Sequence, residues 1–283
     1  MSNLAQRILS AVVLLPFLAV VIWLGGWWVA GAALVAALLG YHELQRMFEA
    51  GGYHPHAGGY ALVAVLVGAA AVQVRWNIAL LGPALTLTVI APLGLVMARR
   101  DLAGALVNWA LTVSGAVYVG WLISHFVLFR SLQQPLTATA PLSALAPHAG
   151  PIWLVWVFAI VMLSDSGAYF VGRAFGKHRM APVISPKKSW EGAIGGVGFS
   201  MLGSVLVVLL FGLPLNVAIA AGLGAVGSIV GALGDLGESL IKRQVGVKDS
   251  GHLIPGHGGM LDRVDSLLFT VPVLYYCVLW LVR

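Results

Sequence analysis

Hydrophobic residues fall into long, nearly continuous runs that are separated by short polar segments. A helix needs about 20 apolar residues to cross the hydrocarbon core of a bilayer, and about nine runs approach that length. They cover residues 8–25, 27–45, 59–75, 77–98, 104–128, 151–171, 192–213, 215–235 and 266–282. The runs are continuous rather than alternating, which favours helices over the strands of a membrane barrel. The pattern therefore predicts an all-α, polytopic membrane protein with about nine transmembrane helices.

The composition supports this prediction. Hydrophobic residues make up 60% of the 283 positions and charged residues only 9%, whereas a soluble domain carries about 25% charged residues. No polar linker is long enough to separate domains. We therefore expect one integral-membrane domain over residues 1–283, with N-terminal helices in 1–150, and with helices and the polar loops that carry the candidate chemistry in 151–283.

The basic residues indicate which side of the membrane the polar segments face. If the N-terminus is cytoplasmic, most of the 16 lysines and arginines fall on the cytoplasmic side, as the positive-inside rule requires. These residues are Arg7, Arg46, Arg99, Arg100, Arg173, Lys177, Arg179, Lys187, Lys188, Lys242, Arg243, Lys248 and Arg263. The distribution predicts a cytoplasmic N-terminus and two large cytoplasmic loops. Because positive charge in a membrane protein is first a topology signal, the net charge of +6 does not indicate nucleic-acid binding.

Small residues recur along the run 215–235. Gly227 and Gly231 form a small-xxx-small pair, which lets two helices approach closely. One interpretation is a seam between two copies of the chain, and the other, which we favour, is packing within one chain. Cys277 is the only cysteine, so no disulfide forms within the chain.

The segment 239–266 is the most polar part of the chain and lies between two apolar runs. It combines lysines, arginines, aspartates, histidines and five glycines within 28 positions. Cations that bind phosphate, carboxylates that bind metals and permissive glycines together predict phosphoryl or nucleotidyl transfer at the membrane surface.

The acidic residues cluster in the same half of the chain. Seven of the ten lie between 165 and 265. Asp235 and Glu238 are three residues apart and share a helix face, as do Asp262 and Asp265. Antiparallel neighbouring helices would bring the two pairs together, and carboxylate oxygens suit Mg²⁺. The alternative is that Asp235 and Asp262 cap helices or pair with Lys242 or with Arg263.

The loop itself offers contacts to phosphate. Lys242 and Arg243 are candidate phosphate ligands, although lipid headgroups would attract them equally. Gly258 and Gly259 allow backbone N–H groups to approach an anion closely. His257 lacks a thiol partner and a zinc-like spacing, so we interpret it as a hydrogen-bond donor.

Three further polar segments border apolar runs. Asp165, within S-D-S-G-A-Y, interrupts an apolar run, and Lys187 and Lys188 stand before the next run like a clamp for polyphosphate. The alternatives are a paired aspartate in a packing patch and two positive-inside lysines. Glu43, within Y-H-E, belongs to a weaker polar cluster near the end of the second run.

The run S-L-I-K-R-x4-K-D-S-G-x2-I-P-G-H-G-G-M-x-D-R-V-D, from Ser239 to Asp265, resembles the signature of phosphatidate cytidylyltransferases (CDP-diacylglycerol synthases). The preceding G-D-L-x-E-S, the S-D-x-x-A-Y element and S-P-K-K-S-x-E-G also resemble elements of that family, in the same order. The resemblance is strong over about 164–266. In the N-terminal half it rests on the hydrophobic pattern alone.

The resemblance implies an enzyme that makes CDP-diacylglycerol and pyrophosphate from CTP and phosphatidic acid with Mg²⁺, and K⁺ as a possible second cation. It also implies a homodimer in the bacterial cytoplasmic (inner) membrane, with the active site on the cytoplasmic side. Asp235 and Asp262 match the metal-ligand positions, and with Lys242, Arg243 and Asp265 they form the implied catalytic set. The implied substrate-binding set is Asp165, Lys187, Lys188, Glu238, Lys248, Asp249, His257, Gly258, Gly259 and Arg263.

Other functions stay open at this point. A cytidylyltransferase acting on a different lipid phosphate is the nearest alternative. An ion-coupled transporter would place polar residues throughout the membrane depth, whereas here they gather on one side. A CDP-alcohol phosphotransferase would show a D-G-x2-A-R pattern, which is absent, and a polyprenol kinase is a further lipid-linked alternative.

Overall fold

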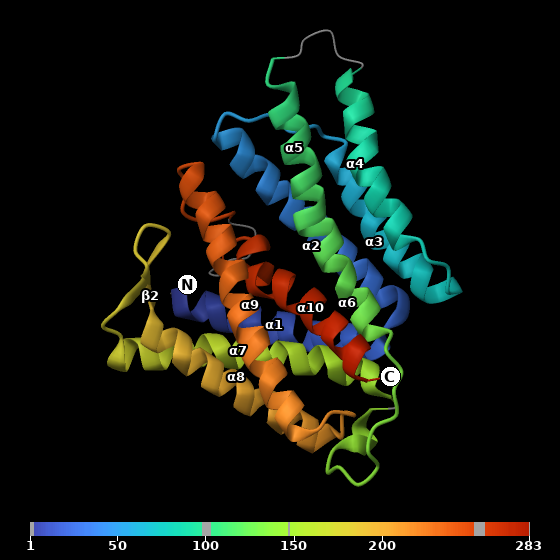
Figure 1. Ribbon diagram of the computed structural model, residues 1–283, viewed down its shortest axis with the longest axis vertical. Coiled ribbons are helices and arrows are strands. Elements are labelled where there is room, and N and C mark those ends of the chain that lie inside the picture. The colour runs from blue at the N-terminus through green and yellow to red at the C-terminus, as the bar shows by residue number, and fades with distance from the viewer. Residues whose placement is uncertain (1–2, 98–102, 147, 252–257, 283) are drawn as a thin grey trace. The chain divides into compact units, whose positions relative to one another are not determined.

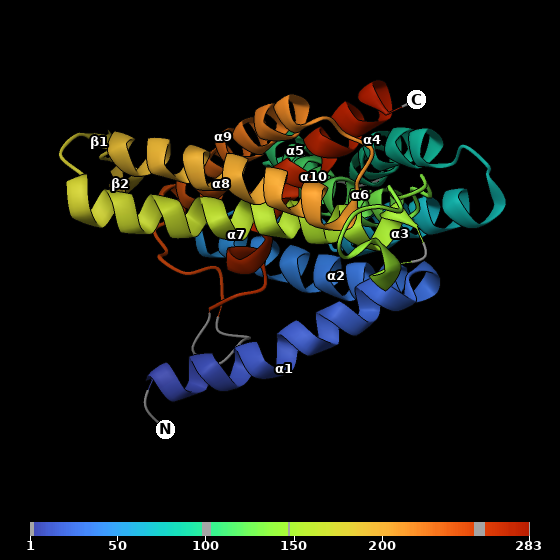
Figure 2. The same ribbon diagram turned by 90° about the horizontal axis from the view of Figure 1, so that it is seen from below.

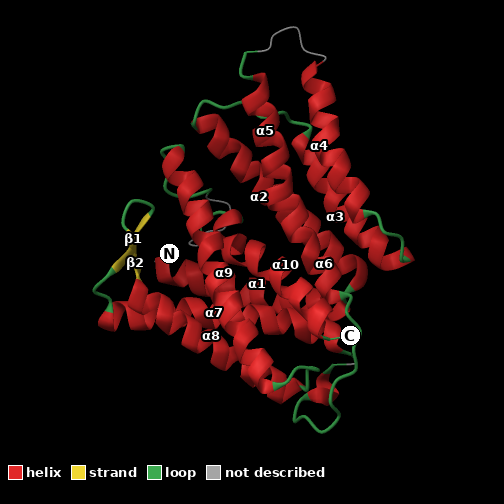
Figure 3. Ribbon diagram, viewed as in Figure 1, coloured by secondary structure: helices red, strands yellow, loops and turns green. Residues whose placement is uncertain are grey.

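The computed structural model describes residues 3–97, 103–146, 148–251 and 258–282. Figures 1 and 3 show a predominantly helical protein in which the two strands form a small hairpin. The helices are α1 (Asn3–Leu24), α2 (Gly26–Ala50), α3 (Gly59–Trp76), α4 (Leu81–Met97), α5 (Ala105–Ala116), α6 (Leu122–Arg130), α7 (Ala149–Phe175), α8 (Trp190–Phe211), α9 (Val217–Gln244) and α10 (Leu261–Leu281). A π-helical turn, η1 (Val117–Trp121), joins α5 to α6, and a 3₁₀ turn, η2 (Ser143–Leu145), precedes α7.

The predicted all-α membrane fold is confirmed, but the count of about nine spans is not. Within the described ranges, seven helices are long and apolar enough to cross a membrane, with α5, η1 and α6 counted as one. The apolar part of α1 (Val12–Leu24) and α4 (Leu81–Met97) fall below that length. Both segments coincide with predicted apolar runs, at residues 8–25 and 77–98.

The chain divides into two compact units that interleave in sequence. Unit 1 comprises 1–128 and 241–264, and unit 2 comprises 129–240 and 265–283. The prediction of a single domain stays a prediction, and each unit is described separately below.

Unit 1 has its core between α2, α3 and the turn η1. Tyr41, Leu66 and Val119 are fully or almost fully buried there. Gly120 in η1 permits this packing, because a Cβ at that position would lie 3.0 Å from the Cα of Val63 in α3. A side chain there would push the two helices apart.

In unit 2, α7 and α8 lie side by side along their length (Figures 1 and 2). Small residues bring their backbones together: a Cβ on Gly167 would lie 2.7 Å from the carbonyl oxygen of Gly195. Trp156 and Trp153 fill the core beside them, and the Trp156 indole N–H donates to Ser204 Oγ at 2.8 Å. Close backbone approach through small residues is the usual way in which helices associate in a bilayer.

The glycines of α9 also pack within unit 2. A Cβ on Gly227 would lie 2.7 Å from Ile160 in α7, and one on Gly231 would lie 3.0 Å from Thr270 Oγ1 in α10. Gly234 contacts the backbone of Asp265 even more closely. For these glycines, the interpretation of packing within one chain is confirmed.

The basic segment between the predicted apolar runs 151–171 and 192–213 contains a β-hairpin. Strands β1 (Arg179–Ala181) and β2 (Ser185–Ser189) pair in antiparallel register, with Arg179 opposite Ser189. Glu191 closes the base of the hairpin by accepting the backbone N–H groups of Lys177 and His178 at 3.1 and 3.2 Å. The hairpin holds the two lysines of S-P-K-K-S in a defined position.

Candidate functional site

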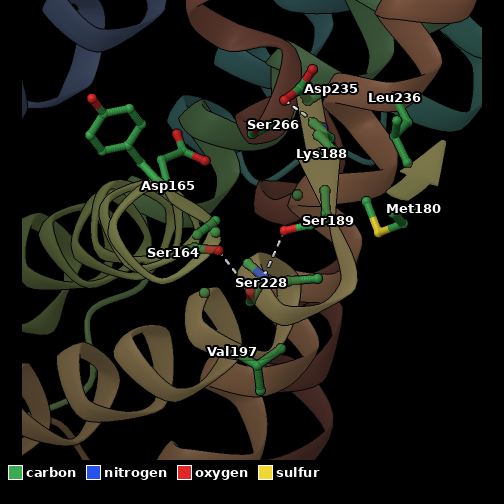
Figure 4. A pocket seen from close by; sticks show the side chains of 18 of the residues that line it. Ser164, Asp165, Met180, Lys188, Ser189, Val197, Ser228, Asp235, Leu236 and Ser266 are labelled. Carbon is green, nitrogen blue, oxygen red and sulfur yellow. Dashed lines mark hydrogen bonds and ion pairs between the residues drawn. The ribbon is translucent and has the colours of Figure 1, made fainter. Parts of the chain in front are cut away.

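Unit 2 contains a cavity of about 780 Å³. Residues of α7, the hairpin, α8 and α9 line it, together with Ser266 of α10 (Figure 4). Cavities of about 300–1,000 Å³ are typical of sites for small molecules and cofactors. Its charged lining residues are Asp165, Arg173, Arg179, Lys187, Lys188 and Asp235. Four cations and two carboxylates around one cavity match the chemistry of a phosphorylated ligand with a bound cation.

Asp235 and Lys188 form an ion pair at the edge of this cavity. The Lys188 Nζ lies 2.6 Å from Asp235 Oδ2, and the two side chains are 24% and 34% exposed (Figure 4). Ser239 Oγ lies one helical turn further along α9 and donates to Asp235 Oδ1 at 3.4 Å. Because the pair is accessible, a ligand that enters the cavity can reach both partners.

The N-terminus of α8 fixes the lysines beside the cavity. Ser189 is the N-cap of α8, and its Oγ accepts the N–H of Gly192 at 3.2 Å. A serine in this position satisfies one of the helix's otherwise unpaired N–H groups. Since Ser189 is also the last residue of β2, the same side chain links the start of α8 to the strand that carries Lys187 and Lys188.

Serines line the inner part of the cavity. Ser164 of α7 and Ser228 of α9 share a hydrogen bond of 2.7 Å, and both are buried (Figure 4). Asp165 follows Ser164 in α7 and also lines the cavity. The polar break that the sequence shows inside this apolar run therefore lies at the cavity wall, rather than at a lipid-facing position.

Unit 1 holds a second polar cluster around Asp262. The Lys242 Nζ lies 2.7 Å from Asp262 Oδ1. Asp262 Oδ2 accepts hydrogen bonds from Ser250 Oγ at 2.8 Å, from the Ser250 N–H at 3.2 Å and from the Gly259 N–H at 2.9 Å. Asp262 thus uses both oxygens to tie the first turn of α10 to the preceding loop and to α9.

The end of α9 positions Lys242 for this contact. Gly246 has φ +75°, in the left-handed region, and its N–H donates to the carbonyl of Arg243, while the Val247 N–H donates to that of Lys242 at 2.9 Å. This pattern is a Schellman motif, which glycine favours because it has no Cβ. The sequence K-R-Q-V-G therefore ends the helix immediately after the two basic residues.

Glu43, which belongs only to a weak polar cluster in the sequence, completes this second site. Glu43 of α2 is 6% exposed. Its Oε1 accepts the Met260 N–H and its Oε2 the Leu261 N–H, both at 2.8 Å. Ser250 Oγ lies 3.2 Å from Glu43 Oε2. Local sequence carries no sign of these contacts, because the partners are 217 and 218 residues away.

The predicted site residues fall into these two clusters and a remainder. Asp165, Lys187, Lys188 and Asp235 meet at the cavity of unit 2, whereas Lys242, Gly259 and Asp262 meet in unit 1. Glu238 is fully buried in α9, and Asp265 Oδ1 accepts the N–H of Ser266. Gly258 has φ +83° beside Asp262. Among the predicted site residues outside the two clusters, Arg243, Lys248, Asp249 and Arg263 are exposed. His257 lies outside the described residues.

The alternative that Asp262 pairs with Lys242 is confirmed. Asp235 instead pairs with Lys188, which is not among the partners predicted for it. Asp235 belongs to unit 2 and Asp262 to unit 1, so the predicted meeting of the two carboxylates stays a prediction. In the sequence Arg173 and Arg179 carry only a topology signal, yet both line the cavity. Within the described ranges, no three histidine, cysteine or acidic side chains group together as a metal cluster.

Apolar helices that enclose a cavity of lysines, arginines and carboxylates define a membrane protein with a site suited to phosphorylated ligands. A sequence model of the Cytidylyltransferase family matches residues 5–281. The chain is 35% identical, over 98% of its length and 97% of the other's, to a phosphatidate cytidylyltransferase of Synechocystis sp.. It is also 47% identical to the enzyme of that name from Staphylococcus aureus over 43% of this chain and 47% of the other. The chain is 46% identical to the phosphatidate cytidylyltransferase of Haemophilus influenzae, over 46% of the length of each chain. The chain belongs to the cytidylyltransferase family.

Proposed function

We propose that this protein is a phosphatidate cytidylyltransferase, which converts CTP and phosphatidate into CDP-diacylglycerol and pyrophosphate. The observation that carries the proposal is the cavity of unit 2, where Arg173, Arg179, Lys187 and Lys188 gather beside Asp165 and Asp235. The similarity to a phosphatidate cytidylyltransferase over almost the full length of both chains supports it. Because the charged residues gather at one cavity, this function is favoured over an ion-coupled transporter.

In the proposed reaction, a phosphate oxygen of phosphatidate attacks the α-phosphorus of CTP. A bond forms between them, and the bond from the α-phosphorus to the oxygen that bridges to the β-phosphate breaks. That oxygen leaves with pyrophosphate. The second pKa of a phosphate monoester is about 6, so the attacking oxygen is already largely deprotonated near neutral pH. The reaction therefore requires no dedicated base.

The main physical obstacle is repulsion between two polyanions. Lysine and arginine side chains at the cavity offset this repulsion and hold the phosphates, with the planar guanidinium groups of Arg173 and Arg179 able to bind two oxygens at once. In a site with little water, preorganised charges of this kind stabilise the developing charge on the leaving oxygen. The cations of the hairpin thus serve both binding and catalysis.

We propose that the reaction uses Mg²⁺, for which Asp235 of unit 2 and Asp262 of unit 1 are each candidate ligands. The donor chemistry fits, because Mg²⁺ is usually held by one or two carboxylates together with substrate phosphates. When bound, the ion polarises phosphoryl oxygens and neutralises their charge. K⁺, the second cation implied by the family resemblance, would also take oxygen ligands.

Each proposed metal ligand has a lysine beside it. Lys188 lies 2.6 Å from Asp235, and Lys242 lies 2.7 Å from Asp262. A cation at either aspartate would take over the neutralising role of the lysine. The ammonium group would then be available to a phosphate oxygen. The same lysine would thus pair with the aspartate before the substrate binds and with the substrate phosphate afterwards.

The proposal also includes a location and an assembly. The predicted excess of lysine and arginine on one side supports a site on the cytoplasmic face of a bacterial cytoplasmic membrane. There the enzyme would meet CTP from the cytoplasm and phosphatidate from the bilayer. A homodimer is implied by the family resemblance and is proposed on that ground alone.

The test is a reconstituted assay with radiolabelled CTP and defined lipid phosphates. Purified protein in nanodiscs is given phosphatidate, a polyprenyl phosphate or no lipid, with Mg²⁺ or with EDTA. We expect lipid-linked CMP and pyrophosphate in equal amounts only with phosphatidate and Mg²⁺. Product from the polyprenyl phosphate alone would show a different lipid substrate, and full activity in EDTA would remove the metal from the proposal.

A further inference from the structure

Glu43 of α2 is a buried carboxylate within a candidate membrane span, Gly26–Ala50. A carboxylate in such a place is costly unless polar partners compensate for lost hydration, and it commonly has a function. The role proposed above for the aspartates and cations leaves this residue unused. Its contacts in unit 1 show what it does.

The two oxygens of Glu43 accept the N–H groups of two successive residues at the start of α10. Oε1 accepts from Met260 and Oε2 from Leu261, both at 2.8 Å. The first N–H groups of a helix have no partner within it, and the helix dipole favours a negative charge there. Glu43 therefore caps α10 from a different helix, which is a tertiary contact rather than a local one.

Two glycines in the polar segment leave room for this carboxylate. A Cβ on Gly251 would lie 2.8 Å from Glu43 Oε1, and one on Gly259 would lie 2.5 Å from Glu43 Oε2. Both distances are shorter than the van der Waals contact distance between a carbon and an oxygen atom. Part of the glycine content of the segment therefore reflects its close packing against Glu43.

Glu43 is connected to the proposed metal ligand through one serine. Ser250 Oγ lies 2.8 Å from Asp262 Oδ2 and 3.2 Å from Glu43 Oε2. Asp262 in turn contacts Lys242. The backbone of Met260 and Leu261 immediately precedes Asp262, so the position of that carboxylate depends directly on the cap that Glu43 provides.

We propose that Glu43 is a positioning residue for cytidylyl transfer: it holds the first turn of α10 and Ser250 so that the carboxylate of Asp262 and the ammonium group of Lys242 keep a fixed geometry during the reaction. The inference rests on the proposed function. A displacement of about 1 Å in a catalytic group can cost about 100-fold in rate. Loss of the cap should therefore reduce kcat much more than it changes the KM for CTP.

The test compares Glu43→Gln and Glu43→Asp with the matched control Glu49→Gln, in full-length protein in nanodiscs. Glu49 lies on the same helix and is exposed, and its carboxylate accepts a hydrogen bond from Gln45 Nε2 at 3.2 Å. Two quantities are measured: kcat with phosphatidate and CTP, and hydrogen exchange of the amides in residues 258–262. Thermal unfolding shows whether each variant remains folded.

We expect Glu43→Gln to lower kcat about 10- to 100-fold, with faster exchange confined to the start of α10. Glu43→Asp retains the charge, so its kcat and its amide exchange should both lie between those of Glu43→Gln and the wild type. Glu49→Gln should resemble the wild type. Unchanged kcat in a folded Glu43→Gln variant, or unchanged exchange at 258–262, would overturn the inference. The hydrogen-exchange measurement does not depend on activity. If the wild type forms no CDP-diacylglycerol, the proposed function is refuted, and the exchange rates still test whether Glu43 caps α10.

Discussion

The two lysine–aspartate pairs of this protein have nearly the same length but different surroundings. Lys188 and Asp235 of unit 2 lie 2.6 Å apart at a cavity, with side chains 24% and 34% exposed. Lys242 and Asp262 of unit 1 lie 2.7 Å apart, with side chains only 11% and 13% exposed. Asp262 also accepts three hydrogen bonds from the preceding loop, whereas the described partners of Asp235 are Lys188 and Ser239.

This difference in exposure indicates that the Lys188–Asp235 pair is accessible to a ligand, whereas the Lys242–Asp262 pair stabilises the surrounding structure. The exposed pair exchanges its partners easily, because solvent screens it and a ligand can reach it. The buried pair is bound into the backbone at the start of α10, so its removal disturbs structure as well as chemistry. A ligand thus reaches the pair of unit 2 directly, whereas opening the pair of unit 1 also disturbs the backbone around Asp262.

The largest expected effect is on stability, and it separates the two aspartates. Asp262→Ala removes the carboxylate beside the buried Lys242, and loss of one partner from a buried pair costs about 3–5 kcal/mol. Asp235→Ala opens an exposed pair, which costs about 0.2–1 kcal/mol. Unfolding of both variants in the same detergent measures the difference. Equal losses of stability would show that the two pairs do not differ as described.

A second prediction concerns nucleotide binding at the exposed pair. Lys188→Met should raise the KM for CTP about tenfold, equivalent to about 1.4 kcal/mol, because a phosphate contact is lost. The melting temperature should stay close to that of the wild type, and Lys188→Arg should restore part of the affinity. An unchanged KM would place the triphosphate away from Lys188.

The smallest expected effect concerns the N-terminal cap of helix α7 in unit 2. His148 caps α7 through Nδ1, which accepts the Gly150 N–H at 3.1 Å. Burial, and then the charge of Arg130, lower the pKa of His148 below its usual value. The neutral imidazole therefore stabilises the fold above about pH 6.5, and this contribution is lost as the pH falls through the lowered pKa.

His148→Asn provides the control for this effect, because asparagine caps a helix without titrating. Between pH 7.5 and 5.5, the melting temperature of the wild type should fall slightly further than that of the variant. An identical pH dependence in both proteins would exclude a contribution from the His148 cap.

Some elements were predictable because their signal is local. The apolar run 27–45 lies within α2 (Gly26–Ala50), and the run 215–235 overlaps α9 (Val217–Gln244) over most of its length. The hairpin was missed because β1 and β2 have only three and five residues and lack an alternating apolar pattern. The polar residues of 185–189 gain their structure from pairing with another strand and from Glu191, not from their own propensity.

The sequence by itself determined the apolar helices and the chemical types available for the site, because hydrophobic run length and residue type are local properties. Only the tertiary structure decided that Lys188 accompanies Asp235, that Lys242 accompanies Asp262, and that Glu43 caps α10. An ion pair or hydrogen bond forms only within a few ångströms. Which side chains come that close depends on helix packing between segments distant in sequence, and the sequence alone does not show that packing.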